Sequence, residues 1–285
     1  MINRFHIISF SVVVILYLSA AVWKYSSSLN EEETGEFTTV QSEEREQIMQ
    51  FWEYYNQATA YRTDRNYELA AAQYENALTI QSDHEDALYY LGSMYLFQKE
   101  FEKTEQKWNE LELHQPNSPR THLQLGTLYF CYDDANQLYD QELAVEKFET
   151  AWELNREETG APLLISKILI LKENYEEAAE LLETVISSNH MSFEAVFLRG
   201  YIDWLNGLGN RAMAGIRNSS NIYQNLYRST LEGEGATEAG ARAMLSEDRF
   251  CDPFELKIRE LLQEIQTMDY EEILRVFDNE VTGWR

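Results

Sequence analysis

A spacing of 34 residues recurs through the middle of the chain and constrains its fold more strongly than any single motif. One position of the repeat is small in every copy, with about six residues inserted in the third; its occupants are Ala58, Gly92, Gly126, Ser166 and Gly200. A second position is also small each time, and its occupants are Ala70, Thr104, Ala144, Ala178 and Ala212. Because a fixed period of this length is typical of stacked structural units, the chain is predicted to build its core from equivalent repeats.

The small positions need a physical reason, because glycine inside a helix costs about 1 kcal/mol relative to alanine. The stretch LGSMYLF places Gly92 between Leu91 and the large side chains of Met94, Tyr95 and Phe97. A second helix that crosses closely at Gly92 would offset this cost, since a small residue lets two backbones approach. The large residues predicted to fill the space beside such crossings are Tyr74, Trp108, Phe148, Leu182 and Ile216.

This combination of period and composition resembles the tetratricopeptide repeat (TPR) over roughly residues 51–226. The resemblance implies that each unit is a pair of helices and that successive pairs stack into a right-handed superhelix. We therefore expect an all-α protein: a TPR-type α-α superhelical solenoid of about five helix pairs, with C-terminal capping helices and one N-terminal transmembrane helix.

Changes in composition divide the chain into predicted segments. These are a signal-anchor or transmembrane helix (1–24), an acidic flexible tether (25–41), the TPR domain (42–226), a mobile connection (227–251) and C-terminal capping helices (252–285). The capping role follows from the amphipathic patterns after Pro253 and Asp269, because a repeat stack needs an end with one polar face. A partner-binding tail is the alternative for these last helices.

The amino terminus contains a run of 17 residues without a charge, from Ile7 to Trp23, which approaches the length of a membrane-spanning helix. A basic residue precedes this run and an acidic cluster follows it. The positive-inside bias then predicts a single-pass protein of the cytoplasmic (inner) membrane with its repeat domain extracytoplasmic. A cleavable signal peptide is the alternative, because Ser19 and Ala21 fit the small-residue positions of a cleavage site.

Charge and cysteine content limit the possible functions. Acidic residues outnumber basic ones 49 to 23, and the net charge of -26 repels nucleic acid phosphates. Cys131 and Cys251 lack the spacing of a zinc or redox site, so we expect two buried thiols, although an oxidising compartment would permit a disulfide. The histidines are scattered singly, and no nucleophile or phosphate-loop motif has its required context. We therefore expect no enzyme activity, no cofactor and no metal.

In the family that this chain resembles, the first helix of each pair lines a concave surface that faces ligands. The corresponding positions predict an apolar, aromatic partner-binding groove of Tyr55, Tyr89, Phe97, Leu123, Phe130, Phe197, Tyr201 and Trp204. Packing against neighbouring repeats or the C-terminal helices is the competing interpretation for any single one of them. Such a groove suits a protein or peptide ligand with an apolar segment.

The predicted function is accordingly a non-enzymatic, membrane-anchored scaffold for protein–protein interaction on the extracytoplasmic side, with envelope protein assembly as its suggested setting. The layout carries this suggestion by analogy, not by a motif. The alternative is a secreted or periplasmic soluble carrier or chaperone, which a cleaved signal peptide would favour.

Overall fold

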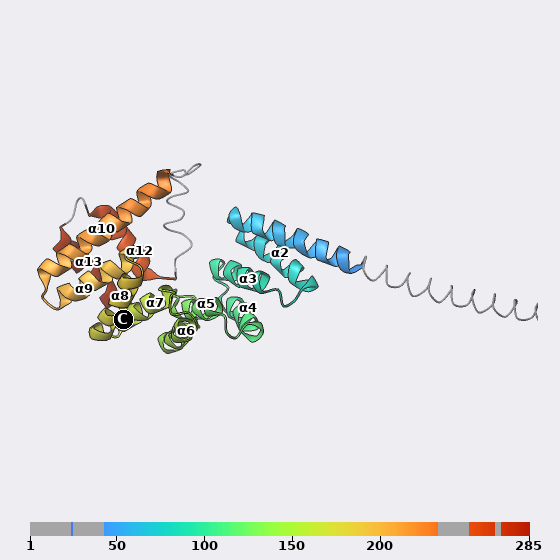
Figure 1. The fold of residues 1–285 in the computed structure, drawn as a ribbon, viewed down its shortest axis with the longest axis horizontal. Helices are drawn as coiled ribbons and strands as arrows, with labels where there is room; N and C mark the ends of the chain where they lie inside the picture. The colour runs from blue at the N-terminus through green and yellow to red at the C-terminus, as the bar shows by residue number, and fades with distance from the viewer. Residues whose placement is uncertain (1–23, 25–42, 233–250, 266–268) are drawn as a thin grey trace, which may run out of the picture.

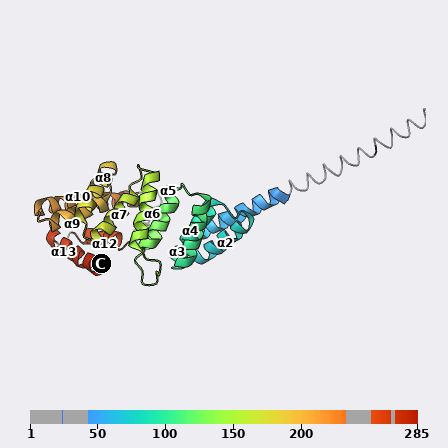
Figure 2. The same cartoon turned by 90° about the horizontal axis from the view of Figure 1, so that it is seen from below.

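The structure, a computed structural model, describes residue 24 and residues 43–232, 251–265 and 269–285. All regular elements in these ranges are α-helices, and no strand occurs among them. The helices form a curved stack that runs from the helix over residues 43–63 to the C-terminal helices (Figures 1 and 2). This arrangement confirms the all-α prediction.

The stack is built from successive helix pairs, as the repeat period predicts. The pairs are residues 43–63 with α2 (Tyr67–Ile80), α3 (Glu85–Phe97) with α4 (Phe101–His114), α5 (Pro119–Phe130) with α6 (Gln141–Leu154), α7 (Gly160–Leu171) with α8 (Tyr175–Ser188), and α9 (Phe193–Leu205) with α10 (Gly209–Glu232). Two further helices follow, α12 (Pro253–Glu264) and α13 (Tyr270–Trp284). The last helix of the repeats, α10, therefore extends beyond residue 226.

The turns inside the pairs share one backbone conformation. Arg65, Lys99 and Glu173 have φ of 59°, 59° and 60°, and Gly207 at the corresponding place in the fifth pair has φ of 75°. A single left-handed residue reverses the chain within a few positions, which keeps the two helices of a pair close. The third pair differs, because residues 131–140 form a longer connection between α5 and α6.

Close helix crossings occur at the small residues that recur along the sequence. A β-carbon at Gly92 would lie 2.3 Å from Trp108 Nε1, and one at Gly126 would lie 2.5 Å from Phe148 Cδ1. The Trp108 indole lies across Gly92 and donates a hydrogen bond of 3.2 Å to the Tyr89 carbonyl oxygen. The structure thus confirms the packing explanation for these glycines, since each leaves room for an aromatic ring of the partner helix.

The two cysteines form a disulfide, so the expectation of two buried thiols is wrong. Cys131 directly follows α5, and Cys251 lies just before the N-cap of α12, with an S–S distance of 2.06 Å. Residues 120 positions apart become neighbours because the C-terminal helices fold back along the stack. A separation of 120 residues in the sequence does not predict that the two cysteines meet.

Within the described part of the chain, no helix combines the length and apolar composition that crossing a membrane requires. This finding contradicts the predicted location as a single-pass protein of the cytoplasmic membrane. The uncharged run over residues 7–23 and the predicted tether over residues 25–41 lie outside the described residues.

Candidate functional site: the concave face

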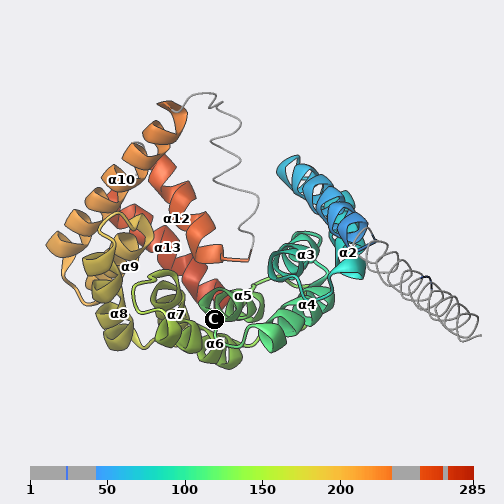
Figure 3. The same ribbon diagram turned by 45° about the vertical axis from the view of Figure 1, so that its right-hand side comes forward.

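The inner side of the curved stack is divided between two surfaces. The first helices of the pairs lie along this side, and α12 and α13 lie inside the curve against the C-terminal pairs (Figure 3). Contacts of α12 with α9 and α10, and of α13 with α7 and α10, hold them there. We call the covered concave surface of α7 and α9 the closed half, and the uncovered surface of residues 43–63, α2 and α3 the open half.

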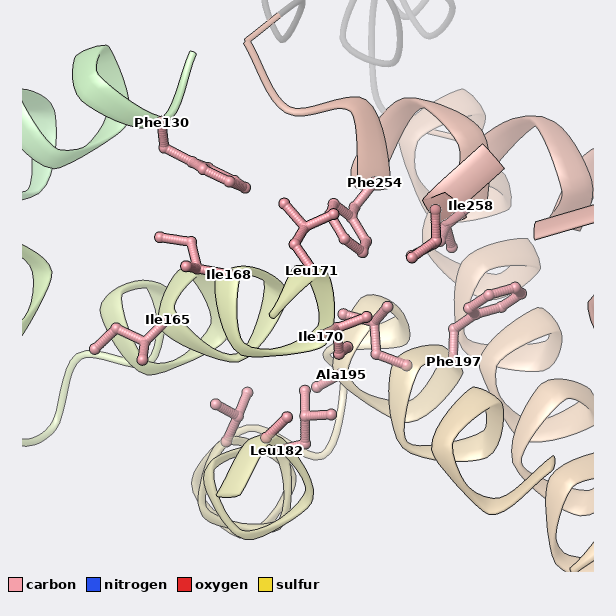
Figure 4. Packing of buried hydrophobic residues seen from close by; sticks show 14 of the residues in the cluster. Phe130, Ile165, Ile168, Ile170, Leu171, Leu182, Ala195, Phe197, Phe254 and Ile258 are labelled. Carbon is pink, nitrogen blue, oxygen red and sulfur yellow. The ribbon is translucent and has the colours of Figure 1, made fainter. Parts of the chain in front are cut away.

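Of the predicted groove residues, Phe130, Phe197 and Tyr201 lie in or beside the closed half and are buried. The centroid of the Phe197 ring lies 4.9 Å from that of the Phe277 ring of α13, and the centroid of the Tyr201 ring lies 5.0 Å from that of Phe277. Figure 4 shows the side chains of Phe254 and Ile258 of α12 pointing toward α7 and α9. These three groove residues therefore contact the chain's own helices and are not open to a partner in this structure.

Polar contacts also hold α13 in place. The Tyr201 hydroxyl donates a 2.7 Å hydrogen bond to Asp278 Oδ1. Burial, and then the neighbouring Asp278 carboxylate, raises the pKa of the Tyr201 phenol well above its usual value. The phenol therefore keeps its proton and remains a donor to α13. Trp204 stacks on Tyr201 at 6.3 Å and is only partly buried.

A buried ion cluster joins the closed half to the first turn of α12. Lys167 of α7 is 1% exposed, and its Nζ lies 2.5 Å from both Glu194 of α9 and Asp252, the N-cap of α12. Beside them, Glu255 pairs with Arg259 within α12. Burial lowers the pKa of the Lys167 ammonium, but the surrounding carboxylates raise it by more, so the ammonium stays charged.

The same carboxylates satisfy one criterion for a cation site. Oxygen atoms of Glu194, Asp252 and Glu255 lie within 4.8 Å of one another. The Lys167 ammonium bonds to two of the three, so it already supplies the positive charge that such a cluster requires. No local sequence pattern predicts this cluster; the only local signal is a lysine inside the apolar run PLLISKILIL.

In the open half, a pocket of about 270 Å³ contains two of the predicted groove residues, Tyr89 and Phe97. Its lining residues are Arg62, Thr63, Arg65, Tyr67, Tyr89, Tyr90, Ser93, Met94 and Phe97. The rings of Tyr67 and Phe97 lie 4.7 Å apart and form an apolar wall. The pocket thus joins aromatic surface from α2 and α3 to cationic groups at the end of the first helix.

Arginine side chains stack on the tyrosines of this pocket. The Arg120 guanidinium carbon lies 3.2 Å from the centroid of the Tyr89 ring, and that of Arg62 lies 4.2 Å from the Tyr90 ring. Arg120 also pairs with Asp86 at 3.1 Å, while Arg62 Nε is buried and has no hydrogen-bond acceptor among the described residues. Two planar cations therefore border an aromatic pocket, although the chain as a whole is strongly acidic.

The remaining predicted residues lie near these surfaces without lining the pocket. Tyr55 packs among the rings of Phe51, Tyr74 and His84, and burial, followed by the Asp86 charge, raises its pKa to about 12. Leu123 is partly buried and packs against the main core. The groove prediction omitted the other seven pocket residues, because each is polar or charged or lies outside the ligand-facing positions of the repeat: Arg62, Thr63, Arg65, Tyr67, Tyr90, Ser93 and Met94.

Comparisons with known proteins agree with this architecture. A family model described as the tetratricopeptide repeat matches residues 55–118. A search of curated proteins returned no match.

Solved structures share the fold at low sequence identity. A structure described as the MamA RS-1 ArsTM double mutant has a TM-score of 0.54 and 11% identity, covering 62% of this chain and 96% of that one. A tetratricopeptide repeat protein from Parabacteroides merdae has a TM-score of 0.52 and 20% identity, covering 80% and 84%. A crystal structure of MamA has a TM-score of 0.51 and 17% identity, covering 60% and 96%. Residues 55–118 therefore carry a tetratricopeptide repeat, and the described helices have the fold of tetratricopeptide repeat proteins.

Proposed function

We propose that this chain is a non-catalytic scaffold that binds a segment of another protein in the open half of its concave face. The observation that carries the proposal is the pocket between the end of the first helix and α3, which aromatic rings and Arg62 line and beside which Arg120 stacks on the Tyr89 ring. Aromatic rings give large contact area at low entropic cost, and the buried Nε donor of Arg62 together with the Arg120 guanidinium favours an acceptor group. The partner segment should therefore combine an apolar side chain with a carboxylate.

The disulfide supports an oxidising compartment for this scaffold. Disulfides persist in secreted and periplasmic proteins and are rare in the cytosol. The Cys131–Cys251 bond joins two structural elements of the stack, α5 and α12. We accordingly propose a secreted or periplasmic binding protein; a role in envelope protein assembly stays a prediction.

Peptide selection followed by binding measurements tests the proposed groove. A random peptide library would be displayed and selected against the full chain, and the affinity of the enriched peptides measured by calorimetry. We expect Tyr89→Ala and Arg120→Ala each to weaken binding at least tenfold, because central aromatic and arginine anchors dominate such interfaces. Enriched peptides should carry an acidic residue beside an apolar one.

The matched control is Leu113→Ala, which removes an 83% exposed apolar side chain from α4, outside the pocket. It should leave the affinity unchanged within twofold. Thermal melting would confirm that each variant remains folded. Full binding by folded Tyr89→Ala and Arg120→Ala variants would refute the assignment of the pocket as the binding site.

A further inference from the structure

The closed half has the chemistry of a helix-binding groove, and its occupant belongs to the same chain. The buried apolar residues of α12 lie on one face of that helix: Phe254, Ile258, Leu261 and Leu262. Those of α13 do the same: Ile273, Leu274, Phe277 and Val281. Amphipathic helices that bind grooves in other proteins present apolar anchors at this spacing.

We propose that α12 and α13 are a resident ligand of the closed half, which the Cys131–Cys251 disulfide holds in place. This inference rests on the proposed function only in treating the concave face as a binding surface. When the two helices undock, the concave surface of α7 and α9 becomes available to an amphipathic helix that is preceded by an acidic residue. Phe197 and Tyr201 would then form the floor of a second binding surface.

The acidic requirement follows from Lys167. Its ammonium is buried and pairs with Glu194 of the repeats and with Asp252 of the docked segment. Asp252 also accepts a hydrogen bond from the Glu255 backbone N–H and so caps α12. One carboxylate therefore both begins the helix and anchors it to the groove. A competing helix without that carboxylate would leave the buried cation with one partner fewer.

The disulfide acts on the undocked state. Cys251 immediately precedes Asp252, so the bond keeps the first turn of α12 beside α5 even when the apolar contacts open. The Tyr132 backbone N–H donates a 3.3 Å hydrogen bond to the Cys251 carbonyl oxygen and reinforces the same place. A short covalent connection gives the helices a high effective concentration at the groove. Removing the bond should raise the rate at which they leave it.

Hydrogen exchange on the full chain tests the proposal without any partner protein. In the variant Cys131→Ser/Cys251→Ser, amides of α12, α13 and α9 should exchange at least tenfold faster than in the disulfide-bonded chain. Amides of α3 and α4 should change less than twofold, because repeat stacks open locally. Unchanged exchange in α12 and α13, or equal acceleration in α3 and α4, would overturn the proposal. So would a variant that loses helicity throughout.

Two further measurements use the same readout. Phe277→Ala keeps the disulfide but removes the ring that contacts Phe197, Tyr201 and Phe254. It should accelerate exchange in α13 at least tenfold and leave α3 and α4 unchanged; uniform acceleration would show that the helices cannot open separately.

A synthetic peptide of residues 252–285, added at about 1 mM to the double variant, should slow α9 exchange at least threefold. No slowing would refute a binding surface there.

The hydrogen-exchange results do not depend on whether the open half binds a peptide. If Tyr89→Ala binds selected peptides normally while the exchange pattern holds, the open-half proposal fails and the resident ligand stands. If the peptides bind at Tyr89 and the C-terminal helices open only with the whole stack, the reverse conclusion follows.

Discussion

Replacement of Gly92 by alanine will lower the free energy of unfolding by about 2–3 kcal/mol. The added methyl group would lie 2.3 Å from Trp108 Nε1, so either the indole or α4 must move. Trp108 is fully buried and hydrogen-bonded to the Tyr89 carbonyl oxygen, which leaves it little room to adjust. Chemical denaturation followed by circular dichroism measures the change.

The matched control is Gly283→Ala, at a helical glycine of α13 where no atom lies within 4 Å of the new β-carbon. Without a clash, alanine should be neutral or should stabilise the chain by up to about 1 kcal/mol. A loss of stability at Gly92 and no loss at Gly283 are expected, because one glycine lies at a helix crossing and the other does not. An unchanged stability of Gly92→Ala would contradict the crossing as the reason for that residue.

Replacement of Lys167 by methionine will have the second large effect, a loss of about 3–5 kcal/mol near neutral pH. Methionine fills a similar volume, but Glu194 and Asp252 then lose the buried cation that both contact. The comparison substitution is Lys172→Met, which breaks a pair with Glu142 at the protein surface. Breaking that pair should change the stability far less, because solvent screens both of its side chains. Equal losses from the two variants would contradict the burial argument.

The deficit of Lys167→Met should shrink as the pH falls. Burial raises the pKa of the Glu194 carboxyl in the folded chain, and the Lys167 charge offsets part of that rise. Without the lysine the folded pKa moves further above the unfolded value, so Glu194 takes up a proton on folding. The loss of stability from this carboxyl is therefore absent below the pKa of Glu194 in the unfolded chain. It grows as the pH rises from that value to the higher pKa in the folded chain, and it is complete above the folded pKa. Stability differences from wild type at pH 4 and pH 8 measure it; a larger deficit at pH 4 would contradict this assignment.

The fold could be predicted from the sequence because each structural position of the repeat occurs in several copies. Gly92 alone would be ambiguous, but small residues at the equivalent positions of five copies specify a crossing in each pair. The left-handed turn residues Arg65 and Lys99 were not predicted, since neither is a glycine or asparagine. Their conformation follows from the tight connection between helices that the repeat imposes.

The binding surface was less predictable because it depends on what folds back onto it. Phe197 and Tyr89 occupy similar places in their repeats, yet α13 covers the first and leaves the second partly open. No local pattern connects Cys131 with Cys251, or Lys167 with Asp252, since 120 and 85 residues separate the members of these pairs. Such contacts form where segments far apart in the sequence fold back onto one another, and no periodic sequence pattern marks these segments.

The most direct test of a concave face with one open half is site-specific photo-cross-linking in the intact chain. A photoreactive phenylalanine analogue would replace Tyr89 in the open half or Leu113 on α4, where the side chain is 83% exposed. We expect cross-links from position 89 to a second polypeptide, reduced by an excess of a selected peptide, and none from position 113. Cross-links of equal yield from both positions, or none from position 89, would contradict this expectation.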